Sequence, residues 1–197
     1  MPPVGGDTLW ASAYEAYDRL SPAYQAFLEG LTATHVGQHF VDLAKRNEKI
    51  VMREPRGSPE NVGQDLTAVH PIVRTNPVTG WKGLFVNREF TKSVNGLTKG
   101  ESDALLEFLF DHISSVCPPA LLLMIVADKQ NHDLQVRFRW EANSLAIWDN
   151  RSTFHAATHD LDEIKRTGTR SVSLGERPYL DPKSTGRREG LRFAKGL

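Results

Sequence analysis

The stretch AIWDNRSTFHAATHDLDEIKRTGTRSVSLGERP, from Ala146 to Pro178, decides the fold of this chain. It contains two segments with the residue types of β-strands, joined by a polar loop. It also places one histidine and two arginines at fixed intervals, because Arg166 follows His155 by eleven residues and Arg170 follows it by fifteen. This spacing predicts that the three side chains come from neighbouring strands.

The chemistry of non-haem iron oxygenases explains why these residue types would occur together. Such enzymes hold Fe(II) with two His and one carboxylate, and leave the opposite positions open for a co-substrate and O₂. A 2-oxo acid can chelate two of those positions, and its far carboxylate then needs a cation such as the planar guanidinium of arginine. His155 would be a ligand. The alternating run RSVSLGE sends Arg170, Val172 and Leu174 to one face, which we expect to be buried towards a barrel interior.

Further stretches extend the pattern: GGDTLWAS (Gly5 to Ser12), HPIVRTNPVTGWKGLFVN (His70 to Asn87) and QVRFRW (Gln135 to Trp140). Together with the Ala146 to Pro178 block, the chain resembles the taurine catabolism dioxygenase (TauD/TfdA) family over most of its length. The resemblance implies a mainly β fold with flanking helices, built on a double-stranded β-helix or jelly-roll barrel. It also implies two cofactors, Fe(II) and 2-oxoglutarate as co-substrate.

The same resemblance implies a role for several residues. His155 falls on the distal iron ligand, Thr8 on the residue that contacts 2-oxoglutarate, and Arg166 on the residue that pairs with its far carboxylate. Arg170 falls on the residue that faces the substrate anion in sulfonate-oxidising members. The resemblance adds three residues to the substrate pocket: Phe85, Asn87 and Trp148.

One part of the family pattern is missing. The family carries its first two iron ligands in a His-x-Asp motif that precedes GGDTLW. In this chain GGDTLW begins only a few residues after Met1, and no His-x-Asp precedes it. His132-Asp133 and His159-Asp160 are adjacent pairs that the family does not place at the metal. We therefore expect an N-terminally truncated version of a longer enzyme, with a barrel incomplete at the N-terminus.

Residues 116–130, VCPPALLLMIVADKQ, interrupt the expected passage from a helix to the strand LQVRFRW. The helix is predicted by the capping box Thr98 and Glu101 and by the apolar face of LLEFLFDHI. The inserted run is too short to span a bilayer. Two explanations stay open: a variable loop or extra buried strand, and a retained intron whose removal would leave HISSNHDLQVRFRW.

Composition favours a single domain over residues 1–197 and limits the partners. The 197 residues carry 24 basic and 24 acidic side chains, so no basic field favours nucleic acid or an anionic membrane. The single cysteine, Cys117, excludes an internal disulfide, and the first residues do not form a signal peptide. We expect a cytoplasmic protein, and composition leaves homo-oligomerisation open.

Other elements follow from local patterns. Two helical segments are expected between residues 12 and 31, the second opened by Ser21 as N-cap and Pro22 as first helical residue. Residues 47–68 read as a long loop or lid. Strands are expected over 83–87, 134–140, 143–149 and 169–176, and a solvated basic extension over 181–197.

Each site residue also has a plain structural alternative. A lone His in a β protein is more often a hydrogen-bonded structural residue than a ligand, and Thr8 in a Gly-rich turn would ordinarily stabilise that turn. Arg166 would be a surface charge, and Trp148 would be core. His35 and His39 have the i,i+4 spacing of a helical metal clasp but lack a third ligand.

These observations predict a 2-oxoglutarate-dependent dioxygenase that uses O₂ to hydroxylate a small anionic organic substrate such as taurine or another alkyl sulfonate. The alternative is a catalytically inactive fragment, or an anion-binding remnant of such an enzyme without the His-x-Asp ligands. A cupin-like isomerase or storage barrel fits less well, since those folds lack this spacing of His and Arg.

Overall fold

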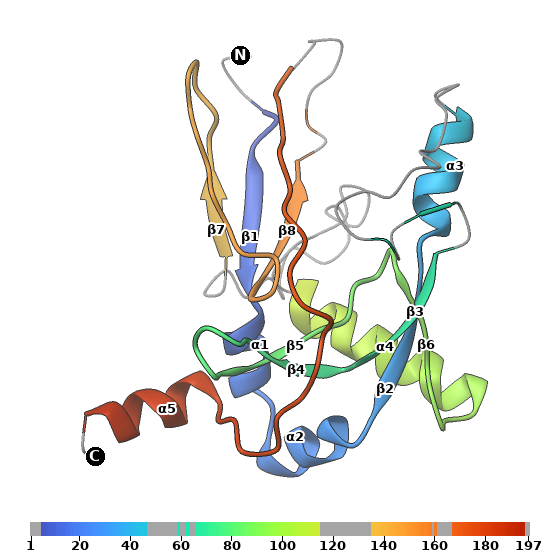
Figure 1. The fold of residues 1–197 in the computed structure, drawn as a ribbon, viewed down its shortest axis with the longest axis vertical. Helices are drawn as coiled ribbons and strands as arrows, with labels where there is room; N and C mark the ends of the chain where they lie inside the picture. Colours follow the sequence, from blue (N-terminus) through green and yellow to red (C-terminus); the bar gives the residue numbers. More distant parts are fainter. Residues whose placement is uncertain are drawn as a thin grey trace.

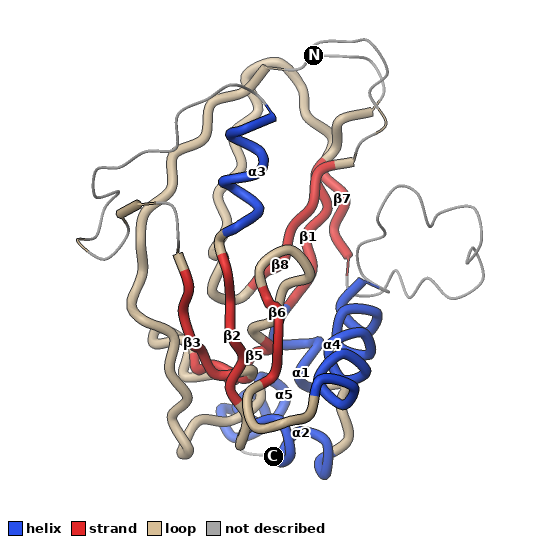
Figure 2. Tube along the Cα trace, turned by 90° about the vertical axis from the view of Figure 1, so that its right-hand side faces the viewer, coloured by secondary structure: helices blue, strands red, loops and turns tan. Residues whose placement is uncertain are grey.

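The computed structural model describes residues 5–46, 59, 62–63, 66–114, 135–158, 160 and 167–195. In this part of the chain, strands form two three-stranded antiparallel sheets and one two-stranded pair, with helices around them (Figure 1). Figure 2 shows the two larger sheets side by side, with α1, α2 and α5 gathered at one end.

The first sheet is centred on β1 (Thr8–Ser12), which follows the Gly-rich turn. Strand β7 (Gln135–Phe138) pairs with one edge of β1 and β8 (Thr153–Ala157) with the other, both antiparallel. Segments more than 120 residues apart in sequence therefore share one ladder. The prediction of a strand over 134–140 is confirmed for β7.

The second sheet has β2 (Thr32–Val36) at its centre, between β3 (Thr67–Pro71) and β6 (Thr91–Val94). Its register shifts between Thr34 and His35 where β2 meets β6. Separately, β4 (Val73–Thr75) pairs with β5 (Lys82–Leu84), so the strand expected over 83–87 begins one residue earlier and ends at residue 84.

Two short helices follow β1 directly, as the sequence predicts between residues 12 and 31. Helix α1 (Ala13–Asp18) begins after Ser12, whose hydroxyl accepts a hydrogen bond from the Glu15 amide. Helix α2 (Pro22–Glu29) begins with proline after Ser21, which caps the Tyr24 amide. None of the helices in the described ranges has the length and apolar character needed to cross a bilayer.

The long helix α4 (Lys99–Ser114) confirms the predicted capping box. The Glu101 carboxylate accepts hydrogen bonds from the amide of Thr98 at 2.9 Å and from its hydroxyl at 2.7 Å. The apolar face of this helix is buried and consists of Leu105, Leu106, Leu109, Phe110 and Ile113. These side chains pack with Leu28, Ala33, Ile72, Val73, Leu84, Val86 and Val94 into the main core.

Two predicted strands are not formed. Residues 143–149 and 169–176 belong to no strand, and Figure 1 draws them as traces without arrows. Their sequences alternate as strands do, but none of the described segments pairs with them in a ladder. Strand propensity alone does not define a strand, because the backbone groups need a partner.

The C-terminal segment is also more ordered than the predicted solvated extension. Helix α5 (Arg187–Ala194) docks on α1, where the Arg188 amide donates to Asp18 Oδ2 at 2.9 Å and its guanidinium pairs with Glu15. A Cβ on Gly186 would lie 2.3 Å from Asp18 Oδ1, so a larger residue here would have to displace the Asp18 carboxylate.

Residues 116–130 lie outside the described residues, as does most of the loop predicted over 47–68. The loop's last residues, Thr67 and Ala68, belong to β3 instead. The insertion hypothesis and the single-domain assignment over 1–197 therefore stay predictions.

Replacing Val86 by Ala tests the core directly. Val86 is 1% exposed, and we expect its truncation to lower the free energy of unfolding by about 1–3 kcal/mol through lost burial and a residual cavity. Val78→Ala is the matched control, since this valine is 77% exposed and should change stability by less than about 0.5 kcal/mol. Urea unfolding of both variants measures the difference, and equal effects would show that Val86 is not core.

Candidate active site

The register of the first sheet brings the predicted site residues onto one face. Trp10 lies directly opposite His155, and Thr8 lies opposite Ala157. Directly paired residues and their i+2 neighbours project from the same face of a sheet. Thr8, Trp10 and His155 therefore share one face, here called the site face, with Val136 and Phe138 from β7.

His155 lies within a cluster of aromatic rings on the site face. Its ring centroid is 5.2 Å from that of Trp148, and Trp148 is 5.2 Å from Trp10. Trp10 in turn packs edge-on against Phe138 at 5.8 Å. Desolvation by these neighbours lowers the pKa of His155, the positive charge of Arg170 lowers it further, and Glu89 opposes the shift. The imidazole is thus neutral at physiological pH, which is the state that binds metals.

Thr8 is held in place by contacts to its side chain and its turn. It is 6% exposed, and its hydroxyl accepts a hydrogen bond from Trp140 Nε1 at 2.9 Å. The preceding residue, Asp7, forms an ion pair with Arg137 at 2.6 Å, and Asp160 Oδ1 accepts from the Gly6 amide at 2.8 Å. Gly5 and Gly6 both have positive φ, which glycine adopts without strain.

The structure describes only one of the two arginines predicted for the site. Arg166 lies outside the described residues, so its role stays a prediction. Arg170 is described and exposed, and its charge reaches His155. The predicted burial of the face formed by Arg170, Val172 and Leu174 is wrong: Val172 is 59% and Leu174 is 51% exposed, because no described strand covers them.

The three residues assigned to the substrate pocket contact different neighbours, and their role in binding substrate stays a prediction. Trp148 contacts His155, as described above. Phe85 lies instead among His35, His70 and Arg74, with ring or guanidinium distances of 5.7, 5.8 and 5.0 Å. Asn87 caps a turn through its side-chain oxygen, which accepts from the Glu89 amide at 2.8 Å.

The i,i+4 histidines do not form a helical metal clasp. His35 belongs to β2 and His39 to α3 (Gln38–Arg46), so they do not share a helix. His35 Nδ1 lies 3.2 Å from the Thr91 hydroxyl, and its ring packs against His70 with centroids 5.3 Å apart. Burial lowers the pKa of His35 to about 4, with the neighbouring His70 contributing.

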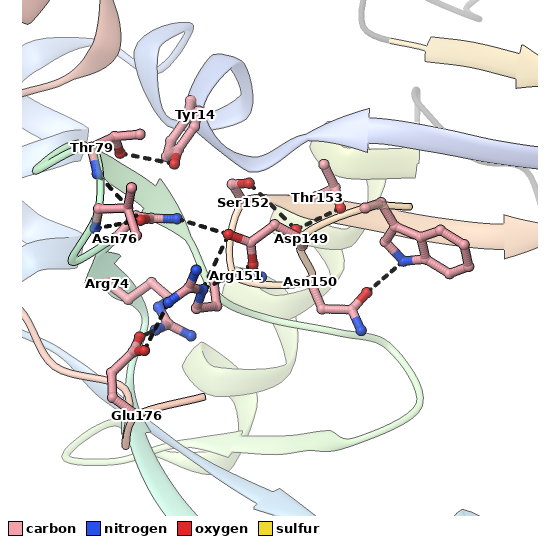
Figure 3. Close-up of polar contacts among 12 residues, drawn as sticks. Tyr14, Arg74, Asn76, Thr79, Asp149, Asn150, Arg151, Ser152, Thr153 and Glu176 are labelled. Atoms are coloured by element: carbon pink, nitrogen blue, oxygen red, sulfur yellow. Dashed lines mark hydrogen bonds and ion pairs between the residues drawn. The ribbon is translucent and has the colours of Figure 1, made fainter. Parts of the chain in front are cut away.

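An ionic network that the sequence analysis did not predict surrounds the turn before β8, the strand that carries His155 (Figure 3). Arg74 on β4 is 3% exposed and pairs with Glu176, whose other oxygen accepts from Arg151 at 3.0 Å. Arg151 also pairs with Asp149 at 2.9 Å, and Asp149 accepts from Asn76 at 3.3 Å. Asp149 and Asn150 form the turn before β8, as expected, since the Asp149 carbonyl accepts from the Ser152 amide. The available sequence signal was Arg74, a charged residue within the strand-like stretch HPIVRT.

The described side chains meet only part of the requirement for an iron site. His155 is a neutral imidazole on an aromatic face, which suits one ligand position of a two-His, one-carboxylate site. Within the described ranges, no three His, Cys, Asp or Glu side chains gather closely enough to hold a metal ion. His155 therefore remains a candidate ligand, and the described residues offer no complete set of ligands.

Comparison with known proteins identifies the family of this chain. The model of the taurine catabolism dioxygenase TauD, TfdA family matches residues 1–172. An α-ketoglutarate-dependent dioxygenase of Penicillium shearii is 48% identical over 187 residues, covering 94% of this chain and 46% of the relative. An α-ketoglutarate-dependent sulfonate dioxygenase of Saccharomyces cerevisiae is 37% identical over 183 residues, or 92% of this chain and 38% of the relative.

A solved structure agrees with these matches. The crystal structure of a putative α-ketoglutarate-dependent taurine dioxygenase from Burkholderia xenovorans has a TM-score of 0.58 and 34% identity, covering 81% of this chain and 44% of that one. The chain belongs to the TauD/TfdA dioxygenase family. It spans about half the length of the curated relatives it matches.

Removing the Glu176 carboxylate should destabilise the network. Glu176→Ala leaves the Arg74 guanidinium buried without its anion, and we expect a loss of about 1–3 kcal/mol in the free energy of unfolding, discounted for the partial exposure of Glu176. Glu107→Ala is the control, because the Arg88–Glu107 pair is exposed and should contribute at most about 1 kcal/mol. Urea unfolding compares the two variants. A smaller loss for Glu176→Ala than for Glu107→Ala would contradict the structural role of the network.

The lowered pKa of His35 predicts a pH dependence of stability. As the pH falls from 6.5 towards 4, the unfolded chain takes up a proton that folded His35 excludes, so stability is complete above 6.5 and declines below it. The full decline is about 3 kcal/mol. His35→Asn should flatten this slope, whereas His39→Asn, at a side chain 41% exposed, should preserve it. Unfolding titrations between pH 4.5 and 7.5 measure the slopes, and an unchanged slope in His35→Asn would refute the assignment.

Proposed function

We propose that this chain forms part of an Fe(II)- and 2-oxoglutarate-dependent dioxygenase that hydroxylates a small anionic substrate, with taurine or another alkyl sulfonate as the first class to test. The observation that carries the proposal is the site face, where the β1–β8 register sets Thr8 and Trp10 beside His155. Membership of the family and the names of the relatives support the reaction type.

The residue roles follow the family pattern. His155 would bind the iron, and the Thr8 hydroxyl and Arg166 would bind 2-oxoglutarate. Arg170 would face the anionic group of the substrate, and its exposure and its electrostatic reach to His155 are compatible with that position. Bound iron would supply activation of O₂ and oxidation of a C–H bond, while protein groups position the reactants and balance charge.

We assign the two larger sheets to a double-stranded β-helix barrel, and the protein to the cytoplasm. The alternative function is an inactive, anion-binding remnant. It is favoured by the single ligand among the described residues. Succinate release from 2-oxoglutarate by the complete protein separates the two, since a remnant would bind anions without turnover.

Replacing Arg166 and replacing Arg170 should impair the binding of different substrates in the catalytically competent protein. Arg166→Ala removes a charge-assisted contact to the far carboxylate and should raise the apparent KM for 2-oxoglutarate by an amount equivalent to about 2–4 kcal/mol. Arg170→Ala should weaken the primary substrate and leave uncoupled decarboxylation of 2-oxoglutarate largely intact. Steady-state kinetics that vary each substrate in turn measure both effects. The same co-substrate defect in both variants, or in neither, would mean that this division of roles is wrong.

A further inference from the structure

Three side chains around the Phe85 ring each carry a buried nitrogen atom that has no hydrogen-bond partner among the described residues. The atoms are His35 Nε2, His70 Nδ1 and Arg74 Nε. The His35 and His70 ring centroids lie 5.7 and 5.8 Å from that of Phe85, and Arg74 Cζ lies 5.0 Å from it. The two imidazole centroids are 5.3 Å apart. Buried polar atoms are nearly always hydrogen-bonded, so three such atoms around one ring indicate a common partner.

Arg74 on β4 provides a donor that is always present. The residue is 3% exposed, and its Nη2 pairs with Glu176, which also accepts from Arg151 at 3.0 Å. A guanidinium stays protonated in proteins, so Arg74 Nε always carries a hydrogen that needs an acceptor. This buried N–H therefore favours a ligand that accepts hydrogen bonds.

The Thr91 hydroxyl determines which nitrogen of His35 carries the proton. Thr91 is 3% exposed, and its hydroxyl oxygen accepts a hydrogen bond from the Asn87 amide at 2.8 Å. The hydroxyl proton needs an acceptor of its own, and among the described groups His35 Nδ1 lies 3.2 Å away. When the hydroxyl donates to Nδ1, the proton of a neutral His35 ring resides on Nε2. His35 Nε2 is then a second buried donor that points to an acceptor.

The charges around His70 favour an anion over a metal ion. Burial lowers the pKa of His70, and the positive charges of Arg177 and Arg74 lower it further. The nearby carboxylates of Glu176 and Asp149 already pair with arginines. Within the described ranges, no third His, Cys, Asp or Glu joins the two histidines in a metal-binding group. With its proton on Nδ1, His70 becomes a third donor in a positively charged environment.

We propose that His35 Nε2, His70 Nδ1 and Arg74 Nε form a binding site for a tetrahedral oxyanion, such as a sulfate, sulfonate or phosphate group. Three N–H donors match the three oxygens that such a group can present, whereas a carboxylate has only two. The Phe85 ring forms an apolar wall between the donors. The site lies on β2, β3 and β4, whereas His155 belongs to the first sheet. It goes beyond the proposed function, because it requires neither iron nor 2-oxoglutarate.

The test is sulfate binding by the full chain without added iron or 2-oxoglutarate. Isothermal titration calorimetry at an ionic strength held constant with sodium chloride measures it. We expect saturable binding of one sulfate per chain, and binding of acetate that is at least about fivefold weaker, because acetate accepts from fewer donors. His70→Phe keeps an aromatic ring but removes one donor, and should lower the sulfate affinity at least about tenfold. His39→Phe is the matched control, since this histidine side chain is 41% exposed and pairs with Glu89, and it should leave sulfate binding unchanged.

Selenate gives a second measurement that needs no variant. It has the shape and charge of sulfate, and its selenium can be located by anomalous scattering. A crystal of the chain soaked in selenate should show a selenium peak whose oxygens lie within hydrogen-bonding distance of the three nitrogens. Water molecules bound to these nitrogens without a selenium peak would overturn the proposal. So would the lack of saturable sulfate binding, or an unchanged sulfate affinity in folded His70→Phe. Acetate binding as tightly as sulfate would refute the assignment to a tetrahedral group.

Discussion

The antiparallel pairing of β1 with β8 is the constraint on which the rest of the site depends. It joins the Gly-rich start of the chain to residues almost 150 positions later, and its register sets Trp10 opposite His155. A slip of one residue would send His155 to the other face of the sheet, away from Thr8 and the aromatic rings. The side chains of Phe154 and Ala11 pack together on that other face, so burial of apolar residues there holds the register.

Ion pairs hold the turn before β8 in place. Arg74 is buried on β4, and its guanidinium requires an anion, which Glu176 provides from the C-terminal segment. Since Glu176 also binds Arg151, the network joins three parts of the chain: β4, the Asp149–Arg151 turn and the segment that follows Arg170. Residues 143–149 and 169–176 are therefore joined to the rest of the fold through Asp149 and Glu176 near their C-terminal ends, while their exposed apolar residues lie earlier in each segment.

The residues around the candidate site differ in how much they are buried and bonded. Thr8 and Trp148 form side-chain hydrogen bonds, and the His155 ring packs against Trp148. Away from the core, Val172, Leu174 and Ile147 have none of the burial that their sequence pattern anticipates.

The sequence by itself determined the family, the elements with local signals and the identity of one iron-ligand candidate. The Thr98–Glu101 capping box, the Ser21–Pro22 helix start and the apolar face of α4 were predictable because their causes lie within a few residues of each other. Only the tertiary structure decided which strand-like segments became strands, because residues 143–149 and 169–176 need hydrogen-bond partners that local sequence cannot supply. It also decided that Phe85 lies with His35 and His70 while Trp148 lies with His155, and that a buried Arg74 binds Glu176. Those contacts join residues far apart in the chain, so their geometry exists only once the chain has folded.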